Sequence, residues 1–151
     1  MSSTIKVLLC DDHTLFRAGL KALLSGEAGL EVVGEAEDGK KGVNKVKKLH
    51  PDVVLMDISM PRMNGFEATQ VIVQSYKDVK VLMLTMYDED DVIIRCLEAG
   101  ASGFVLKDAP AEQLAFAIRK AWKGGRYLSP GVVSKAVREY LKTSDRPPRI
   151  S

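Results

Sequence analysis

Hydrophobic residues recur along this chain in short, nearly unbroken runs separated by more polar segments. Such runs are typical of β-strands, and those without a polar interruption indicate strands buried on both faces of a sheet. The clearest run is Val53-Val54-Leu55-Met56, which ends at Asp57 and is followed by a turn. The predicted strands cover residues 5–10, 30–36, 53–57, 79–84 and 103–106.

The segments between these runs place apolar residues at the three- and four-residue spacing of helices. The predicted helices begin after Asp12, at Gly39, and near Phe66, Asp90 and Pro110. Their predicted apolar sides include Leu15 and Leu23 in the first helix and Trp122 in the last. Because five strands alternate with five helices, the pattern predicts an α/β fold, with a parallel, doubly wound sheet covered by helices on both faces.

A sixth, short helix is predicted in the tail that follows Gly124-Gly125. Its N-cap is predicted to be Ser129, with Pro130 in the first turn. Apolar residues at helical spacing form its expected contact side: Val132, Val133, Ala136, Val137, Tyr140 and Leu141. We therefore divide the chain into a domain of residues 1–123 and a linker of residues 124–151. Two alternatives stay open: the helix folds back on the domain, or it presents its apolar side to a second copy of the chain or to another domain.

Polar side chains stand at the ends of four predicted strands. Asp11 and Asp12 follow the first strand, and Asp57 ends the third. Thr85 comes at the end of the fourth strand, and Lys107 directly after the fifth. In doubly wound sheets, ligands bind beyond the carboxyl ends of the strands. We therefore expect three carboxylates, a hydroxyl and an ammonium group to share one site.

Three clustered carboxylates repel one another unless protons or a cation share the site. Oxygen ligands without a histidine or cysteine cluster favour a hard cation such as Mg²⁺. A metal, the ammonium group of Lys107 and the hydroxyl of Thr85 together suit a phosphoryl group. Asp57, at the centre, is then the predicted nucleophile that forms an aspartyl-phosphate.

Each candidate has a plainer interpretation when it is taken alone. Asp11 and Asp12 could cap a helix. Lys107 could be a solvated surface residue, and Phe104 could belong only to the core. The common position at strand ends favours the site instead. His13, beside the acid pair, could ligate a metal, but a single histidine without partners is weak evidence, and we interpret it as a helix-start residue without a catalytic role.

Composition adds limits to this picture. The chain is 46% apolar and 28% charged, as expected for a globular domain with a core. Its net charge of +2 does not indicate nucleic-acid binding, although six positive and two negative residues lie after Lys123. The distant Cys10 and Cys96 indicate reduced thiols and a cytoplasmic location. No apolar run approaches the roughly 18 residues of a membrane span, so we expect no membrane contact.

Taken together, the strand-end motifs resemble the receiver domains of two-component response regulators over about residues 4–123. In chain order they are Asp11-Asp12, Asp57 followed by Met60-Pro61 and Gly65, Thr85, and Phe104 with Lys107. The resemblance implies the flavodoxin-like (CheY-like) fold, with strand order 2-1-3-4-5 and five flanking helices, to which we add the predicted linker helix. It also implies that Asp57 takes a phosphoryl group from a partner histidine kinase.

The resemblance further implies how the cation is held. Asp12, Asp57 and the backbone carbonyl of Ser59 would ligate Mg²⁺ (or Mn²⁺), with Asp11 acting largely through water. The chain would then not be an enzyme in the ordinary sense, because it would only phosphorylate and dephosphorylate itself.

A switch pair is implied as well. Thr85 would move toward the phosphate, and the ring of Phe104 would turn inward behind it. The surface altered by this switch would be the helix of residues 90–99, the fifth strand and the last helix of the domain.

Finer details are similar to the NarL/FixJ (LuxR-type) subfamily, in which a helix-turn-helix domain follows the receiver. They are Asp11-Asp12-His13 with Arg17-Ala18-Gly19-Leu20, Leu84-Thr85-Met86-Tyr87-Asp88, and Gly124-Gly125-Arg126-Tyr127-Leu128-Ser129-Pro130. The resemblance implies that DNA binding belongs to a domain beyond Ser151, and the apolar side of the tail helix leaves a homodimer open as a further partner. One departure is that Asp108, and not proline, follows Lys107, so the cis peptide bond that many receivers have there is not assumed and stays an open question.

Two other functions stay open at this point. A phosphatase of the haloacid dehalogenase type also uses an aspartate nucleophile, but it needs a second aspartate where this chain has Ser59. A degenerate receiver that binds partners without phosphorylation is the other alternative, although every residue needed for the chemistry is present.

Overall fold

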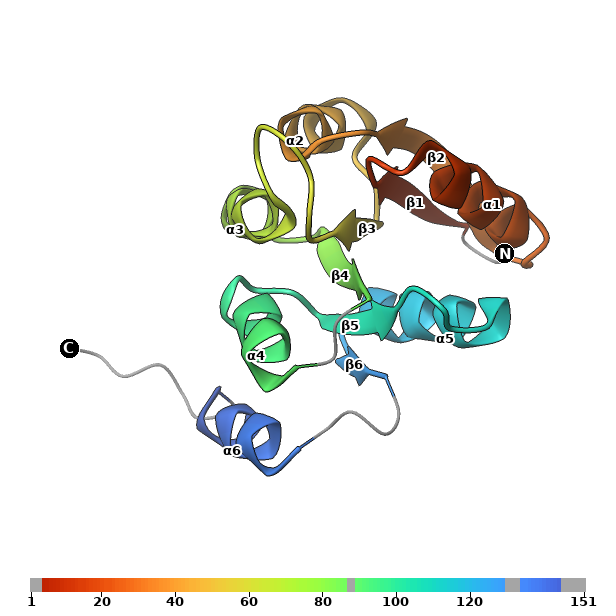
Figure 1. Cartoon of the computed structure of the whole chain (residues 1–151). Coiled ribbons are helices and arrows are strands. Elements are labelled where there is room, and N and C mark those ends of the chain that lie inside the picture. The colour runs from red at the N-terminus through yellow and green to blue at the C-terminus, as the bar shows by residue number, and fades with distance from the viewer. Residues whose placement is uncertain (1–3, 87–88, 130–133, 145–151) are drawn as a thin grey trace.

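The computed structural model describes residues 4–86, 89–129 and 134–144. A parallel sheet runs through the centre of the molecule, with strands in the order β2-β1-β3-β4-β5-β6 (Figure 1). The strands are β1 (Ile5–Cys10), β2 (Leu30–Ala36), β3 (Val53–Asp57), β4 (Lys80–Thr85), β5 (Gly103–Leu106) and β6 (Tyr127–Leu128). The predicted strand order is confirmed, and β6 is an addition that the pattern did not reveal.

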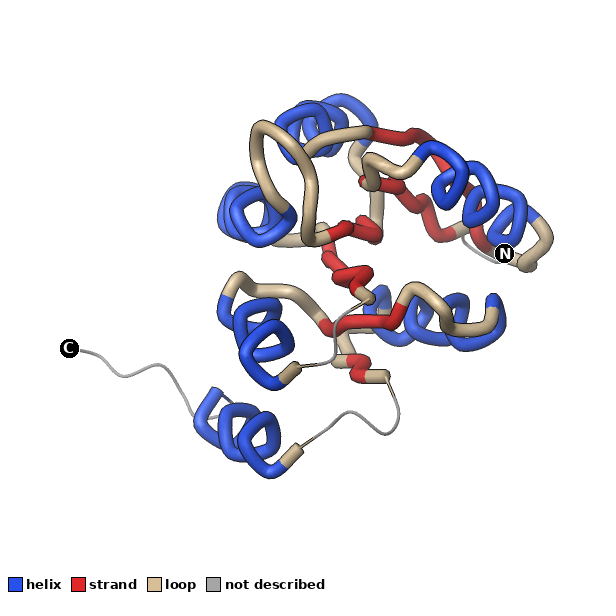
Figure 2. Tube along the Cα trace, in the orientation of Figure 1, coloured by secondary structure: helices blue, strands red, loops and turns tan. Residues whose placement is uncertain are grey.

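Six helices surround the sheet and alternate with the strands along the chain (Figure 2). They are α1 (Thr14–Ser25), α2 (Gly39–Leu49), α3 (Gly65–Ser75), α4 (Asp90–Glu98), α5 (Ala111–Trp122) and α6 (Lys135–Ser144). Helices α1 and α5 cover one face, and α2, α3 and α4 cover the other. The doubly wound α/β architecture is thus confirmed. Among the described residues, no helix is long and apolar enough to cross a membrane.

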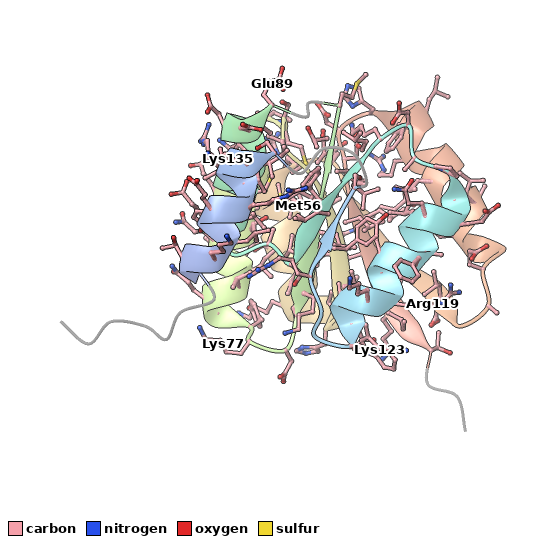
Figure 3. All side chains as sticks on the ribbon, turned by 90° about the horizontal axis from the view of Figure 1, so that it is seen from below. Met56, Lys77, Glu89, Arg119, Lys123 and Lys135 are labelled. Carbon is pink, nitrogen blue, oxygen red and sulfur yellow. The ribbon has the colours of Figure 1, made fainter. Side chains whose placement is uncertain are left out.

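Strand β3 is buried on both faces, as its unbroken apolar run predicted. Val54 and Met56 pack in the core beneath α2, α3 and α4, whereas Val53 and Leu55 pack in the core beneath α1 and α5. This alternation follows from the two-residue period of a strand. Figure 3 shows Met56 in the interior of the fold. A strand packed on both sides holds the residue at its end, Asp57, in a fixed place.

The predicted apolar sides of α1 and α5 are wrong in part. Leu15 and Leu23 are 90% and 54% exposed, and Trp122 is 38% exposed. Leu20 and Leu24, which belong to the same predicted side of α1, are buried as expected. Leu15 and Leu23 line an apolar groove of about 300 Å³, which Leu114 of α5 also lines.

The C-terminal segment folds back on the domain, which decides between the two alternatives for the predicted tail helix. Helix α6 packs beside α4 (Figure 1), and Val137 is completely buried there. Burial, together with the nearby charge of Glu98 on α4, raises the pKa of Tyr140. The other half of the predicted apolar side, Val132 and Val133, lies outside the described residues.

The predicted cap of this helix is also wrong. The Oγ atom of Ser134 accepts a hydrogen bond from the backbone N–H of Val137 and so caps α6. Ser129 instead accepts a hydrogen bond from the N–H of Leu106 at 3.1 Å, next to β6. Strand β6 can approach β5 because Gly103 has no Cβ atom. A Cβ atom at this position would lie only 1.7 Å from the carbonyl oxygen of Tyr127. Pro130 lies outside the described residues.

Candidate functional site

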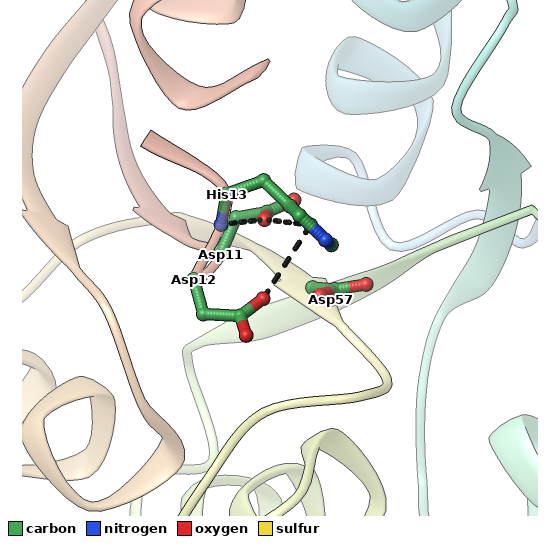
Figure 4. A group of neighbouring side chains, drawn as sticks. All are labelled: Asp11, Asp12, His13 and Asp57. Carbon is green, nitrogen blue, oxygen red and sulfur yellow. Dashed lines mark hydrogen bonds and ion pairs between the residues drawn. The ribbon is translucent and has the colours of Figure 1, made fainter. Parts of the chain in front are cut away.

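The predicted acidic residues meet at the carboxyl edge of the sheet (Figure 4). Asp11 and Asp12 follow β1, and Asp57 ends the neighbouring strand β3. Together with His13, these residues can each offer one ligand atom within 4.8 Å of the others. The convergence expected from the strand ends is therefore present.

Both backbone polar groups of Asp11 are hydrogen-bonded. Its N–H donates to the carbonyl of Ala36, which extends the pairing of β1 and β2 by one residue. Its carbonyl accepts a hydrogen bond from the guanidinium of Arg17, which in turn donates to Glu35 at 2.9 Å. Arg17 was not predicted to take part, although its position four residues after His13 places it one helical turn along α1.

Asp57 is a buried carboxylate, with 4% of its surface exposed. Gly65 lets the start of α3 come close behind it, since a Cβ atom there would lie 2.2 Å from the carbonyl oxygen of Asp57. Burial, followed by the charge of Asp11, raises the pKa of Asp57 to about 6, against the lowering effect of Lys107. Its Oδ2 atom has no hydrogen-bond partner among the described residues. A buried anionic oxygen of this kind is unfavourable unless a cation or a proton reaches it.

Lys107 brings the third strand end into the site. Its Nζ atom lies 2.8 Å from Oδ2 of Asp11 and 3.2 Å from Oδ1 of Asp57, and its side chain is only 9% exposed. It also lies 4.7 Å from the ring centroid of Phe16. Burial alone would lower the pKa of Lys107, but its hydrogen bond and charge interactions with the two carboxylates outweigh that effect and raise it. The peptide bond to Asp108 is trans, which answers a question that the sequence left open.

Thr85 and Phe104, the predicted switch pair, lie on adjacent strands. Thr85 ends β4 and is buried, with its backbone carbonyl accepting a hydrogen bond from the N–H of Lys107. Phe104 pairs with Met83 across the sheet and is completely buried in the core beneath α4. Its β6 neighbour in the sheet is Leu128.

Ser59 lies in the loop after β3, at an open depression of about 620 Å³. Asp12 lines the same depression, which brings these two predicted ligands together. Arg95 of α4 lies there as well, 4.2 Å above the ring of Phe66, and was not singled out from the sequence. The depression leads from solvent to the acid cluster.

His13 is the N-cap residue of α1, in agreement with its interpretation as a helix-start residue, and its ring also contacts the acid pair. Its Nδ1 atom is 3.0 Å from Oδ1 of Asp11, 3.4 Å from Oδ1 of Asp12 and 3.4 Å from Nζ of Lys107. Its adjacency to the acid pair in the sequence was the available signal.

The acid cluster fits a hard divalent cation. Three carboxylates converge, and buried Oδ2 of Asp57 has no hydrogen-bond donor among the residues described. Carboxylate and carbonyl oxygens are the ligands that Mg²⁺ and Mn²⁺ prefer. Asp12 and Asp57 belong to the cluster, and Ser59 lines the depression beside Asp12.

The sequence of residues 7–119 matches the response regulator receiver domain family. The chain belongs to this family. The curated relative DegU, a transcriptional regulatory protein of Brevibacillus brevis, is 44% identical to the receiver over 138 residues, which cover 91% of this chain and 58% of DegU. The chain thus spans less than two thirds of that relative's length.

Solved structures agree with this assignment. A LuxR-family response regulator from Aurantimonas is 33% identical to the receiver, with a TM-score of 0.84 over 92% of this chain and 99% of that one. The signal receiver domain of the response regulator NarL from Mycobacterium tuberculosis is 36% identical, with a TM-score of 0.77 over 81% of this chain and 98% of that one. The receiver is therefore of the NarL/FixJ type.

Proposed function

We propose that this receiver accepts a phosphoryl group on Asp57 from a sensor histidine kinase, with Mg²⁺ or Mn²⁺ bound at the acid cluster. The observation that carries the proposal is the buried carboxylate of Asp57, which ends a rigid strand, has one unpaired oxygen, and is flanked by Lys107 and Asp11. Such a carboxylate is held in a fixed position for nucleophilic attack, and little solvent around it has to be reorganised.

In the proposed transfer, a carboxylate oxygen of Asp57 forms a bond to phosphorus as the bond from phosphorus to the kinase histidine breaks. The electron pair of the broken bond stays with that imidazole. Lys107 pairs with one phosphoryl oxygen, and the hydroxyl of Thr85 donates to another. The divalent cation, held by Asp12, Asp57 and the carbonyl of Ser59, with Asp11 acting largely through water, offsets negative charge between carboxylates and phosphate when it is bound.

The output of the transfer is a change of surface. Thr85 shifts toward the phosphate, and Phe104 follows behind it, so that α4, β5 and α5 are rearranged. In this chain, the β5 edge and α4 are covered by β6 and α6, so the segment that leads out of the receiver lies on the surface that changes.

We propose that the receiver, as residues 1–123, acts through residues 124–151 on a helix-turn-helix domain that lies beyond this sequence, and that DNA is contacted only by that domain. The relative DegU, a transcriptional regulatory protein, and the LuxR-family regulator from Aurantimonas support this role. The partners are then a cognate kinase and, for DNA binding, a second copy of the chain, in the cytoplasm.

The family and the site bear on the two alternative functions, a phosphatase and a degenerate receiver. Family membership supports a receiver and gives no support to a haloacid dehalogenase-type phosphatase, for which Ser59 stands where an acid is needed. The intact cluster of Asp11, Asp12, Asp57 and Lys107 is evidence against a degenerate receiver that works without phosphorylation.

The experiment is incubation of the protein with acetyl phosphate or phosphoramidate and Mg²⁺, followed by mass spectrometry of the intact chain. We expect one added phosphoryl group that hydroxylamine removes, and none in Asp57→Asn. Asp78→Asn, an exposed acid between α3 and β4, is the matched control and should be phosphorylated like the wild type. Stoichiometric uptake by Asp57→Asn would show that the nucleophile is another residue.

A further inference from the structure

The imidazole of His13 faces the acid cluster at distances that suit a shared ligand sphere. Its Nδ1 atom lies 3.0 Å from Oδ1 of Asp11 and 3.4 Å from Oδ1 of Asp12 (Figure 4). Neighbouring ligands of one small divalent ion, with bonds of about 2.1 Å, lie about 3.0 Å apart in an octahedron and about 3.4 Å apart in a tetrahedron. His13 and the acid pair are thus spaced as ligands of the same cation.

A second observation points to a cation at this place. The Oδ2 atom of Asp57 belongs to a side chain that is more than nine-tenths buried and makes no hydrogen bond within the described part of the chain. Asp57 belongs to the acid cluster, in which one ligand atom from each of Asp11, Asp12, His13 and Asp57 lies within 4.8 Å of the others.

Lys107 shares the site with these ligand atoms. Its Nζ atom contacts Oδ2 of Asp11 and Oδ1 of Asp57 and lies 3.4 Å from Nδ1 of His13, whereas His13 contacts the other oxygen of Asp11. On Asp11, the ammonium group and a cation at His13 would therefore use different carboxylate oxygens.

We propose that His13 is a nitrogen ligand of the cation at this site and a determinant of its metal specificity. It favours borderline divalent ions such as Ni²⁺, Co²⁺ and Zn²⁺, because imidazole suits these ions, whereas Mg²⁺ prefers oxygen and keeps water as a ligand. The inference rests on the proposed function in that both use the same acid cluster. It adds a competition between borderline metals and Mg²⁺, in which the former bind at lower concentration.

The test is isothermal titration calorimetry with NiCl₂ and, separately, MgCl₂ on the wild type, His13→Gln and His50→Gln. The side chain of His13 is 63% exposed, so glutamine should be accepted without loss of the fold, which circular dichroism checks. His50, the other histidine of the chain, follows α2 and is the matched control. A second readout is the NMR signals of the imidazole protons, which a bound paramagnetic Ni²⁺ shifts strongly.

We expect His13→Gln to weaken Ni²⁺ binding at least tenfold and to leave Mg²⁺ binding within twofold, with His50→Gln unchanged for both metals. Ni²⁺ should shift the His13 ring signals in the wild type. The proposal is overturned if His13→Gln weakens both metals equally, if it leaves Ni²⁺ binding intact, or if His50→Gln has the same effect. Failure here with normal phosphoryl uptake in Mg²⁺ contradicts only the role of His13, whereas failed uptake with an intact nickel effect contradicts only the proposed function.

Discussion

The Nζ atom of Lys107, the residue after β5, lies 3.2 Å from Oδ1 of Asp57, the last residue of β3. The same ammonium group lies 2.8 Å from Asp11, so a single side chain from the end of β5 joins the ends of β1 and β3. A charge with two carboxylate partners can move from one to the other at little cost. This arrangement suits a group that must follow a phosphoryl oxygen when it arrives.

Replacing Lys107 with alanine should slow phosphorylation more than it weakens metal binding. Without the ammonium group, the negative charge that develops on the phosphoryl oxygens loses its partner. We therefore expect the rate of phosphorylation to fall by about tenfold or more. Mg²⁺ affinity should stay equal or rise, since one competing cation is gone. The measurements are the time course of labelling by acetyl phosphate and a Mg²⁺ titration.

Lys120→Ala, which removes an exposed lysine from α5, is the control for the loss of positive charge and should label at the wild-type rate. A Lys107→Ala protein that labels normally but binds Mg²⁺ poorly would assign Lys107 to the metal site instead.

Removing the charge of Asp57 should stabilise the fold at neutral pH. The pKa of this carboxyl rises from its ordinary value of 3.8 to about 6 in the folded protein, chiefly through burial. Between these values the folded state binds more protons than the unfolded state, so the free energy of unfolding falls as pH rises from about 4 to 6. Above pH 6 the destabilising effect is complete.

In Asp57→Asn this effect is absent, and we expect the variant to be about 1–2 kcal/mol more stable than the wild type at pH 7.5 in EDTA. At pH 4 the two proteins should unfold alike. Urea unfolding at both pH values measures the difference, and Asp78→Asn serves as the comparison. Added Mg²⁺ should narrow the gap by stabilising the wild-type carboxylate, and a variant less stable than the wild type at pH 7.5 in EDTA would contradict the assigned burial penalty.

Much of the site could be predicted because its residues follow strands of strong hydrophobic character. Val53 to Met56 could only be a buried strand, and parallel strands end at a common edge, so Asp57 was bound to meet Asp11. The place of His13 could not be predicted in the same way. A lone histidine has no spacing partner, and only the turn into α1 directs its ring to the acids.

The fold shows the same division. The strand order agrees with the prediction, but Leu15 and Leu23 fit the helical period and are nevertheless exposed, because periodicity does not tell whether a neighbouring helix covers a side. Strand β6 is only two residues long and depends on the close approach of Tyr127 to Gly103, a tertiary contact without a local signal.

Arg17 should matter both for stability and for the position of the acid pair. Its guanidinium joins the carbonyl of Asp11 to Glu35, and its side chain is 15% exposed. In Arg17→Ala the Asp11 carbonyl loses this donor, and we expect about 1–2 kcal/mol less stability. Phosphorylation should slow several-fold because Asp11 and Asp12 are held less firmly. Chemical unfolding and acetyl phosphate labelling measure the two effects.

Lys21 offers a matched comparison, since it lies on the same helix and reaches the same Glu35 at 3.4 Å with a side chain that is 53% exposed. Lys21→Ala should change stability by less than about 0.5 kcal/mol and leave labelling unchanged. If Arg17→Ala and Lys21→Ala have equal effects on stability and labelling, then Arg17 acts only through its charge and not through its hydrogen bond to Asp11.

The docking of α6 on α4 depends on Val137, the completely buried residue of that helix. Val137→Ala removes two methyl groups from this contact, which costs about 1–2 kcal/mol in a packed core. Because α6 lies at the end of the described chain and packs on the receiver beside α4, the loss should appear as local opening and not as global unfolding. Hydrogen exchange of the α6 amides should become about tenfold faster, while β3 amides keep their wild-type rate.

Val71→Ala makes the same chemical change at a position on α3 that is 37% exposed, and it should leave α6 exchange unaltered. Because α6 and β6 cover α4 and β5, the surface proposed to change on phosphorylation, the Val137→Ala protein should also lose most of any effect of Asp57 phosphorylation on α6 exchange. If phosphorylation alters α6 exchange equally in the wild type and in Val137→Ala, then the response of α6 to phosphorylation does not depend on Val137.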